Sequence, residues 1–240
     1  MRPALPLSAI VLLVATSIAS ANPARLVEPA LRLPQESSGE ARVALTLDAC
    51  GRRTDTRILS ALVENRIPAT IFVTGIWLRR NPDAVAILKA HPDLFEIENH
   101  GAHHIPAIDR PVSVYGIAAA GSTDGVAREV MGGADAMAKA GLSQPHWFRG
   151  ATAKYTPTSI VQIQALGFRI AGYSLNADGG SLLGTTTTEH RVEAARDGDV
   201  LIAHINQPTH PAGAGLVKGL LALKARGISF VRLADVAGNV

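Results

Sequence analysis

The sequence predicts an α/β fold, a distorted or incomplete barrel of parallel strands with helices on the outside. Short β-branched runs alternate with helical patterns almost to the end of the chain, which is typical of parallel sheets. About 219 residues follow the expected signal peptide, which is enough for one α/β barrel. Polar side chains follow several predicted strands, as in barrels whose loops form an active-site face.

The chain opens with the layout of a secretory signal peptide. A positive residue, Arg2, precedes an apolar stretch over 5–18, and small residues lead up to Ala21. We expect cleavage after Ala21 and a secreted or periplasmic protein, because the apolar stretch is too short to span a bilayer and no later run is longer. The expected organisation is signal peptide 1–21, an N-terminal extension over 22–42 and one domain over 43–240.

Composition excludes some classes of function. Lys and Arg total 23 against 20 Asp and Glu, a net charge of +3 with no basic run. Because aromatic-rich nucleic-acid motifs are also absent, no nucleic-acid partner is expected. The single cysteine, Cys50, cannot form an internal disulfide, so packing must hold the exported fold together. Nothing in the residues predicts an oligomeric state.

The predicted elements follow one another in a regular order. Strands are predicted over 43–47, 69–73, 95–98, 146–148, 169–174, 200–203 and 229–233. Helices are predicted over 58–63, 81–88, 126–137, 156–166, 192–196 and 216–226. Thr54 or Asp55 can cap the first helix, Pro82 suits a first helical position, and Gly167 suits a C-terminal cap. The segment 105–125 is long for a connector and is predicted to be a functional loop.

Two histidines supply the first candidate site. His100 and His104 lie four residues apart just after a predicted strand, and on a helical turn both rings can meet one divalent cation. The alternative is that both belong to an ordinary surface turn; His103 between them is the expected bystander. Zinc normally takes three protein ligands and a water, and Asp48 is the carboxylate best placed to be the third ligand.

Six polar residues follow predicted strands and should therefore lie on one face of the barrel. They are Asp48, His100, His104, Arg149, Asp178 and His204. Each has an ordinary structural alternative: a surface cation for Arg149, a turn residue for Asp178, and a satisfied buried histidine for His204. Polar residues end many strands, but six on a single face are harder to attribute to chance.

These motifs resemble those of the polysaccharide deacetylases, the NodB-like family four of carbohydrate esterases. Thr46-Leu47-Asp48, the histidine motif, Trp147-Phe148-Arg149, Asp178 and Ile202-Ala203-His204 occur in the family's order, from about Val43 to Leu233. The resemblance implies a distorted (β/α) barrel in which an aspartate and two histidines hold a divalent metal. It implies that a neighbouring aspartate is the general base and a distant histidine the general acid.

The resemblance also assigns individual roles. It implies that Asp48 is the base, that Arg149 orients and charges it, and that His204 is the acid, kept protonated by Asp178. A guanidinium placed against a carboxylate would lower its pKa and hold it ionised.

The sequence departs from the family pattern in two places. Where the family has two adjacent aspartates, base then ligand, Asp48 is followed by Ala49 and Cys50. We favour Asp48 itself as the metal ligand. Asp55 could instead reach the metal from the start of the next helix, although capping that helix suits it better, or Cys50 could bind as a thiolate. The segment after Arg149 lacks the family's proline and nearby tyrosine, so the usual oxyanion donor is not evident.

The expected function is that of a metal-dependent hydrolase that removes acetyl groups from N-acetylated sugars of a polysaccharide or peptidoglycan. The expected metal is zinc, with cobalt or nickel as alternatives, and the expected partner is an acetylated glycan. Hydrolysis of another non-peptide carbon–nitrogen amide bond is the alternative within the hydrolases. A carbohydrate-binding relative made inactive by Ala49 is the alternative outside them.

Overall fold

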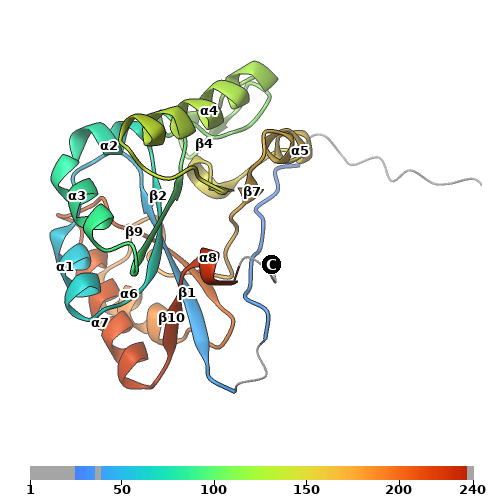
Figure 1. The fold of residues 1–240 in the computed structure, drawn as a ribbon. Coiled ribbons are helices and arrows are strands. Elements are labelled where there is room, and N and C mark those ends of the chain that lie inside the picture. Colours follow the sequence, from blue (N-terminus) through green and yellow to red (C-terminus); the bar gives the residue numbers. More distant parts are fainter. Residues whose placement is uncertain (1–24, 36–38, 237–240) are drawn as a thin grey trace, which may run out of the picture.

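The computed structural model describes residues 25–35 and 39–236 and places a curled parallel sheet at the centre (Figure 1). The signal peptide expected over 1–21 lies outside the described residues. The strands of this sheet are β1 (Arg42–Ala49), β2 (Ala69–Val73), β3 (Phe95–Asn99), β6 (Trp147–Phe148), β7 (Arg169–Ile170), β8 (Leu175–Asn176), β9 (Val200–His204) and β10 (Ser229–Val231). The order is β7-β6-β3-β2-β1-β9-β8, with β10 beside β1, and all neighbours run parallel. In the described part of the chain β7 and β8 do not pair, so the barrel is incomplete, as predicted.

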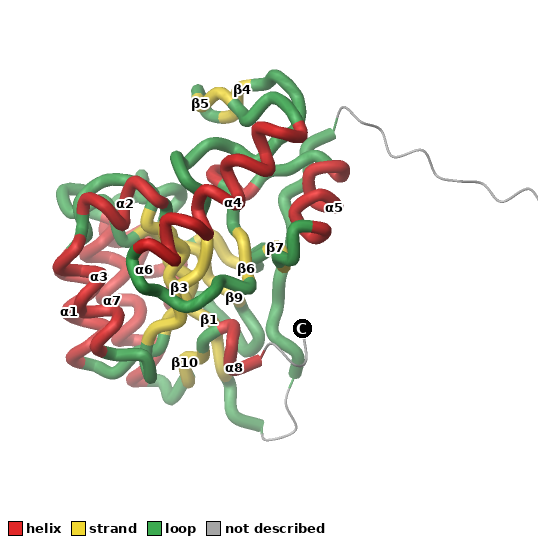
Figure 2. Tube along the Cα trace, turned by 45° about the horizontal axis from the view of Figure 1, so that its top comes forward, coloured by secondary structure: helices red, strands yellow, loops and turns green. Residues whose placement is uncertain are grey.

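Helices cover the outside of this half-barrel (Figure 2). They are α1 (Thr56–Glu64), α2 (Gly75–Arg80), α3 (Pro82–Ala90), α4 (Thr123–Lys139), α5 (Pro157–Ala165), α6 (Thr185–Glu193), α7 (Ala212–Ala225) and α8 (Leu233–Val236). Along the outer layer, α7 packs against both α1 and α6, and α4 packs against both α2 and α5. None of the described helices has the length and apolar character needed to cross a membrane.

The central strand β1 is buried along its whole length. Val43, Leu45 and Leu47 belong to the core beneath α1 and α7, whereas Ala44 packs into a second cluster on the other side of the sheet. Successive side chains of a strand point to opposite faces. Asp48 therefore shares the inner face with Ala44, which directs its carboxylate into the half-barrel.

Local signals set several helix boundaries. Asp55 caps α1 by accepting a hydrogen bond from the Arg57 N–H, and Pro82 occupies the first turn of α3. After α5, Gly167 has a φ of +93°, the left-handed conformation that glycine adopts without steric cost. These three predictions are confirmed.

Other predicted boundaries were wrong. The helix expected over 192–196 is α6, which begins at Thr185, because Thr188 and Val192, four residues apart, form its buried face. The strand expected over 169–174 is limited to β7, and β8 follows separately. The strand expected over 229–233 ends at Val231. The short helix α2 was missed.

The long segment 105–125 holds a small hairpin, β4 (Ser113–Val114) with β5 (Ile117–Ala118), and α4 begins inside it at Thr123. Residues 25–35 lie along the half-barrel. Val27 forms an antiparallel bridge with Tyr155, and Arg32 forms both a bridge and an ion pair with Asp199.

The buried Glu98 on β3, with Glu96 beside it, leads to a stability prediction. Burial, reinforced by the neighbouring Glu96, raises the pKa of Glu98 from 4.5 to about 9. Because the folded state holds this proton more tightly than the unfolded chain, the Glu98 contribution is favourable below about pH 4.5 and is lost as pH rises toward 9. Glu98→Gln keeps an acceptor for the backbone N–H groups of His146 and Trp147. This substitution should raise Tm at pH 8, by about 2–4 °C for each kcal/mol gained in the free energy of unfolding. At pH 4 it should change Tm little.

Thermal unfolding of both proteins at the two pH values measures this effect. Glu64→Gln removes the same charge from an exposed position on α1 and serves as the control. An equal Tm change at pH 4 and pH 8 would contradict the role given to Glu98.

Candidate active site

The residue at the centre of the half-barrel is Arg149, whose side chain is fully buried. It follows β6, and its guanidinium donates to Asp48 Oδ1 at 3.0 Å and to Thr46 Oγ1 at 2.8 Å. It also donates to the carbonyls of Ala171 and Gly172, at 3.1 and 2.9 Å. Arg149 is thus held from several strands, and it fixes Asp48 rather than lying on the surface.

Asp48 is held in its ionised form. Burial alone would raise the pKa of Asp48, but the nearby positive charges, chiefly those of His100 and Arg149, outweigh burial and lower that pKa below its usual value. One carboxylate oxygen is engaged by Arg149. The other, Oδ2, lies 3.8 Å from Nε2 of His100. Asp48 is therefore a buried carboxylate with one oxygen directed toward the histidines.

His204 and Asp178 form a second pair at the end of the neighbouring strand. Asp48 and His204 are register partners on β1 and β9, which brings both side chains to the same edge of the sheet. Nδ1 of His204 lies 3.1 Å from both carboxylate oxygens of Asp178. Asp178 also accepts from the backbone N–H groups of His204 and Gly180. Burial alone would lower the pKa of His204, but the Asp178 carboxylate raises it well above its usual value.

The tautomer of His100 follows from its contacts. Its Nδ1 is hydrogen-bonded to the backbone carbonyl of Arg149, and a carbonyl can only accept. Nδ1 therefore carries the proton, and Nε2 of the neutral ring has a free lone pair. Metal-bound histidines usually donate their other N–H to such a carbonyl or carboxylate. His100 thus presents Nε2 as a potential metal donor.

The loop after β3 is shaped by Glu129, a residue that sequence analysis missed. This buried side chain on α4 accepts hydrogen bonds from the backbone N–H groups of His103 and Ile105. Gly101 has a φ of +90°, and a Cβ there would lie 2.3 Å from Glu129 Oε1, so both the backbone and the packing favour glycine. The turn leaves His104 with a φ of +60°, a costly conformation for a side-chain-bearing residue. A mid-helix glutamate gives no sequence signal of this role.

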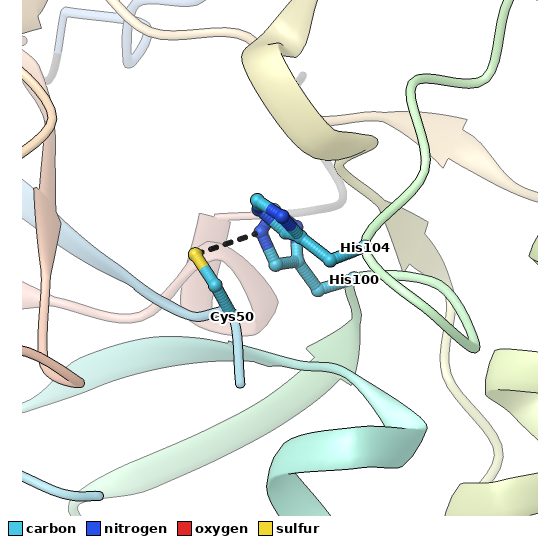
Figure 3. Close-up of side chains that lie close together, drawn as sticks. All are labelled: Cys50, His100 and His104. Carbon is cyan, nitrogen blue, oxygen red and sulfur yellow. Dashed lines mark hydrogen bonds between the residues drawn. The ribbon is translucent and has the colours of Figure 1, made fainter. Parts of the chain in front are cut away.

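Three potential metal ligands gather at this point: Cys50, His100 and His104 (Figure 3). Their donor atoms all lie within 4.8 Å of one another, and Cys50 Sγ is 3.6 Å from His100 Nε2. Asp48 is not one of this group. Asp55 is occupied elsewhere, in the cap of α1 and in an ion pair with Arg57. The geometry therefore favours Cys50, which follows β1 directly, over Asp48 and Asp55 as the third donor.

The chemistry of the three donors fits a divalent cation such as zinc, which thiolate and imidazole both bind. Burial alone would raise the pKa of Cys50, but hydrogen bonds from His100 and His104 outweigh it and lower that pKa well below its usual value. Burial alone would lower the pKa of His100, and the neighbouring Asp48 and Cys50 raise it. A cysteine binds a cation as the thiolate, so the lowered pKa of Cys50 favours metal binding at this cluster.

A pocket of about 320 Å³ opens over this cluster, lined among others by Cys50, His104 and His204. The segment after Arg149 forms a short 3₁₀ turn, η1 (Ala151–Ala153). Tyr155 beyond it is fully buried, and its hydroxyl accepts from the backbone N–H of Gly150. Tyr155 therefore fixes the backbone beside Arg149 and does not enter the pocket.

A half-barrel with polar side chains gathered at the carboxyl ends of its strands defines an enzyme-type active site. The sequence model of the polysaccharide deacetylase family matches residues 35–171. The chain therefore belongs to the polysaccharide deacetylase family, as a divergent NodB-homology domain of the hydrolases that act on non-peptide carbon–nitrogen bonds. A search of curated proteins finds no match.

Solved structures share this fold. A peptidoglycan deacetylase from Bacillus subtilis is 17% identical, with a TM-score of 0.67, and the match covers 83% of this chain and 91% of that one. A family 4 carbohydrate esterase from Streptomyces lividans, in complex with acetate, is 19% identical at a TM-score of 0.62, covering 79% and 91%. A CE4 family pseudoenzyme from Bacillus anthracis is 17% identical, with a TM-score of 0.64. The match covers 82% of this chain and 66% of that one.

Proposed function

We propose that this protein is an exported, metal-dependent deacetylase that hydrolyses the N-acetyl groups of sugars in a polysaccharide or peptidoglycan. The observation that carries the proposal is the cluster of Cys50, His100 and His104 beside the buried Asp48. The family match supports deacetylation, and the N-terminal stretch that ends at Ala21 supports export.

The roles of the residues follow from their hydrogen bonds. A cation held by Cys50, His100 and His104 would supply Lewis-acid polarisation of the acyl carbonyl and a more acidic water. Asp48, kept ionised by Arg149, accepts the proton that the attacking water loses. His204 donates a proton to the nitrogen of the departing amine. Asp178 orients the His204 ring through Nδ1, and His204 is one of the residues that line the pocket.

The substrate class is tested by acetate release. Purified protein loaded in turn with zinc, cobalt or nickel should release acetate from chito-oligosaccharides or from peptidoglycan strands. If acetate appears with neither, while another acylamide is cleaved, the alternative of a different non-peptide carbon–nitrogen bond replaces the glycan.

The thiolate ligand can be observed directly. Because Co²⁺ bound to a thiolate absorbs in the near ultraviolet and Co²⁺ bound only to carboxylate and imidazole does not, the cobalt-loaded protein should show this band. Cys50→Asp should retain about one metal per chain and lose the band, because a carboxylate can replace the thiolate. No band in the wild-type protein, or one that persists in Cys50→Asp, would remove Cys50 from the ligands.

One competing function rests on a specific observation. Ala49 stands where the family has an aspartate ligand, and a similar fold is found in a CE4 family pseudoenzyme. The competing proposal is a carbohydrate-binding protein without activity. Saturable glycan binding without acetate release in any metal would favour it. The buried acid and base pairs at His204 and Asp48 argue against it, because binding alone needs neither.

A further inference from the structure

The pocket over the donor cluster has an unbalanced charge. Its rim carries Arg52 from the loop after β1 and Arg80 from the last turn of α2, and both side chains are exposed. No Asp or Glu belongs to the residues that line it. Neither guanidinium has an ion-pair partner among the described residues, in contrast to Arg32, Arg57 and Arg66. Two uncompensated positive charges therefore stand at the entrance.

One of the two rim arginines, Arg80, is held in place by the backbone beside the site. Nη1 of Arg80 donates to the carbonyl of Gly51 at 2.7 Å, which ties α2 to the loop that carries Cys50. The backbone carbonyl of Arg52 accepts from the Asn81 side chain at 3.1 Å, just beyond α2. The Arg52 guanidinium itself has no hydrogen bond among the described residues. Arg80 is thus positioned, and Arg52 is free to bind a ligand.

The second observation concerns two buried polar atoms in the lining of this pocket. Asn206, only 1% exposed, lines the pocket, and its Oδ1 has no hydrogen-bond partner among the described residues. Within the same part of the chain, the buried Oε1 of the adjacent Gln207 is also unpaired. A buried polar atom without a partner is costly and calls for an explanation. An N–H or O–H of a bound sugar would satisfy these atoms.

We infer that this pocket is a subsite for an anionic acylated sugar, in which Arg52 and Arg80 bind a carboxylate or phosphate of the residue to be deacetylated. The inference rests on the proposed function for its choice of a sugar amide. Arginine suits either anion because its planar fork can donate two parallel hydrogen bonds. A pocket of about 320 Å³ is at the small end for ligand sites, which run from about 300 to 1,000 Å³. It therefore suits one sugar residue better than an extended chain.

The test compares kcat/KM on three N-acetylated sugars of matched length: a neutral one, one with a carboxylate as in N-acetylmuramic acid, and one with a phosphate. The wild-type protein should favour one or both anionic sugars, and Arg52→Gln should reduce the anionic-to-neutral ratio about tenfold, or about 1.4 kcal/mol. Arg80→Lys, which keeps the charge, should largely retain the ratio. The anion that shows the larger loss identifies the group that is bound.

Arg53→Gln with Arg79→Gln is the matched control, since both positions are exposed arginines next to the rim residues but outside the pocket lining. If this double variant lowers the ratio as much as Arg52→Gln, general charge explains the preference and the subsite is refuted. Equal rates on all three sugars in the wild-type protein also refute it.

Binding separates this inference from the proposed function. Calorimetric titration with glucosamine 6-phosphate and muramic acid, compared with glucosamine, needs no turnover. If no sugar is deacetylated but the anionic ones bind at least tenfold more tightly and Arg52→Gln removes the difference, the subsite stands and the deacetylase proposal fails. Equal binding of all three sugars overturns the subsite, whatever the activity.

Discussion

His100→Ala combined with His104→Ala should leave the protein folded, free of bound metal and at least about a thousandfold less active. Two of the three donor atoms that lie within 4.8 Å of one another are lost in this variant. A bound cation contributes several kcal/mol of transition-state stabilisation, and each 1.36 kcal/mol is worth about tenfold in rate. Elemental analysis and acetate release, measured on the same preparation, check both parts of the prediction.

His103→Ala is the matched control for this experiment. Its side chain is 64% exposed and its ring lies beside Glu129, outside the donor group. The substitution keeps the backbone N–H that Glu129 accepts. Metal content and rate should therefore stay near those of the wild-type protein. A double variant that keeps its metal and its activity would show that the two histidines hold no catalytic cation.

Asp48→Asn should separate the base from the metal ligands. The amide keeps the size of the carboxylate but cannot accept the proton of the attacking water. General-base catalysis contributes about 10²–10⁴-fold, so kcat should fall by that factor. Metal content should stay at the wild-type level, because Cys50, His100 and His104 are intact. Pre-steady-state or steady-state acetate release, with elemental analysis, measures both.

The same variant leaves the buried Arg149 without its counter-charge. Removing one partner of a buried ion pair lowers the free energy of unfolding by about 3–5 kcal/mol. Circular dichroism must therefore show that the variant is folded at the assay temperature. Loss of metal from a folded Asp48→Asn protein would instead make Asp48 a ligand, as the sequence analysis favoured. Full activity would exclude both roles.

Much of the fold could be predicted because each signal is local. The strands over 43–47 and 69–73 were recognised from runs of buried β-branched and aliphatic side chains, and β1 and β2 lie there. The Asp55 cap was recognised because its hydrogen bond joins two residues that are only two positions apart in the sequence. Short elements were missed or misplaced. The two-residue strand β8 exists only because β9 pairs with it, and α6 is helical through its packing against α7.

The candidate site was only partly predictable. Arg149, Asp178 and His204 were singled out because each follows a strand, and the structure brings each of them to the same end of the sheet. The third donor could not be chosen from the sequence. Asp48 and Cys50 are two residues apart, and only the structure shows that Cys50 is the one whose donor atom groups with those of both histidines.

The sequence by itself determined the alternation of strands and helices, the order of the motifs and the family. These depend on hydrophobic periodicity and residue type, which are properties of the sequence. The tertiary structure alone decided which side chains meet. Cys50 and His100 are fifty residues apart, yet they lie 3.6 Å apart because β1 and β3 flank β2 in the same parallel sheet. Arg52 and Arg80 reach one pocket for the same reason: the loop that carries Arg52 and the helix α2 that carries Arg80 follow the neighbouring parallel strands β1 and β2.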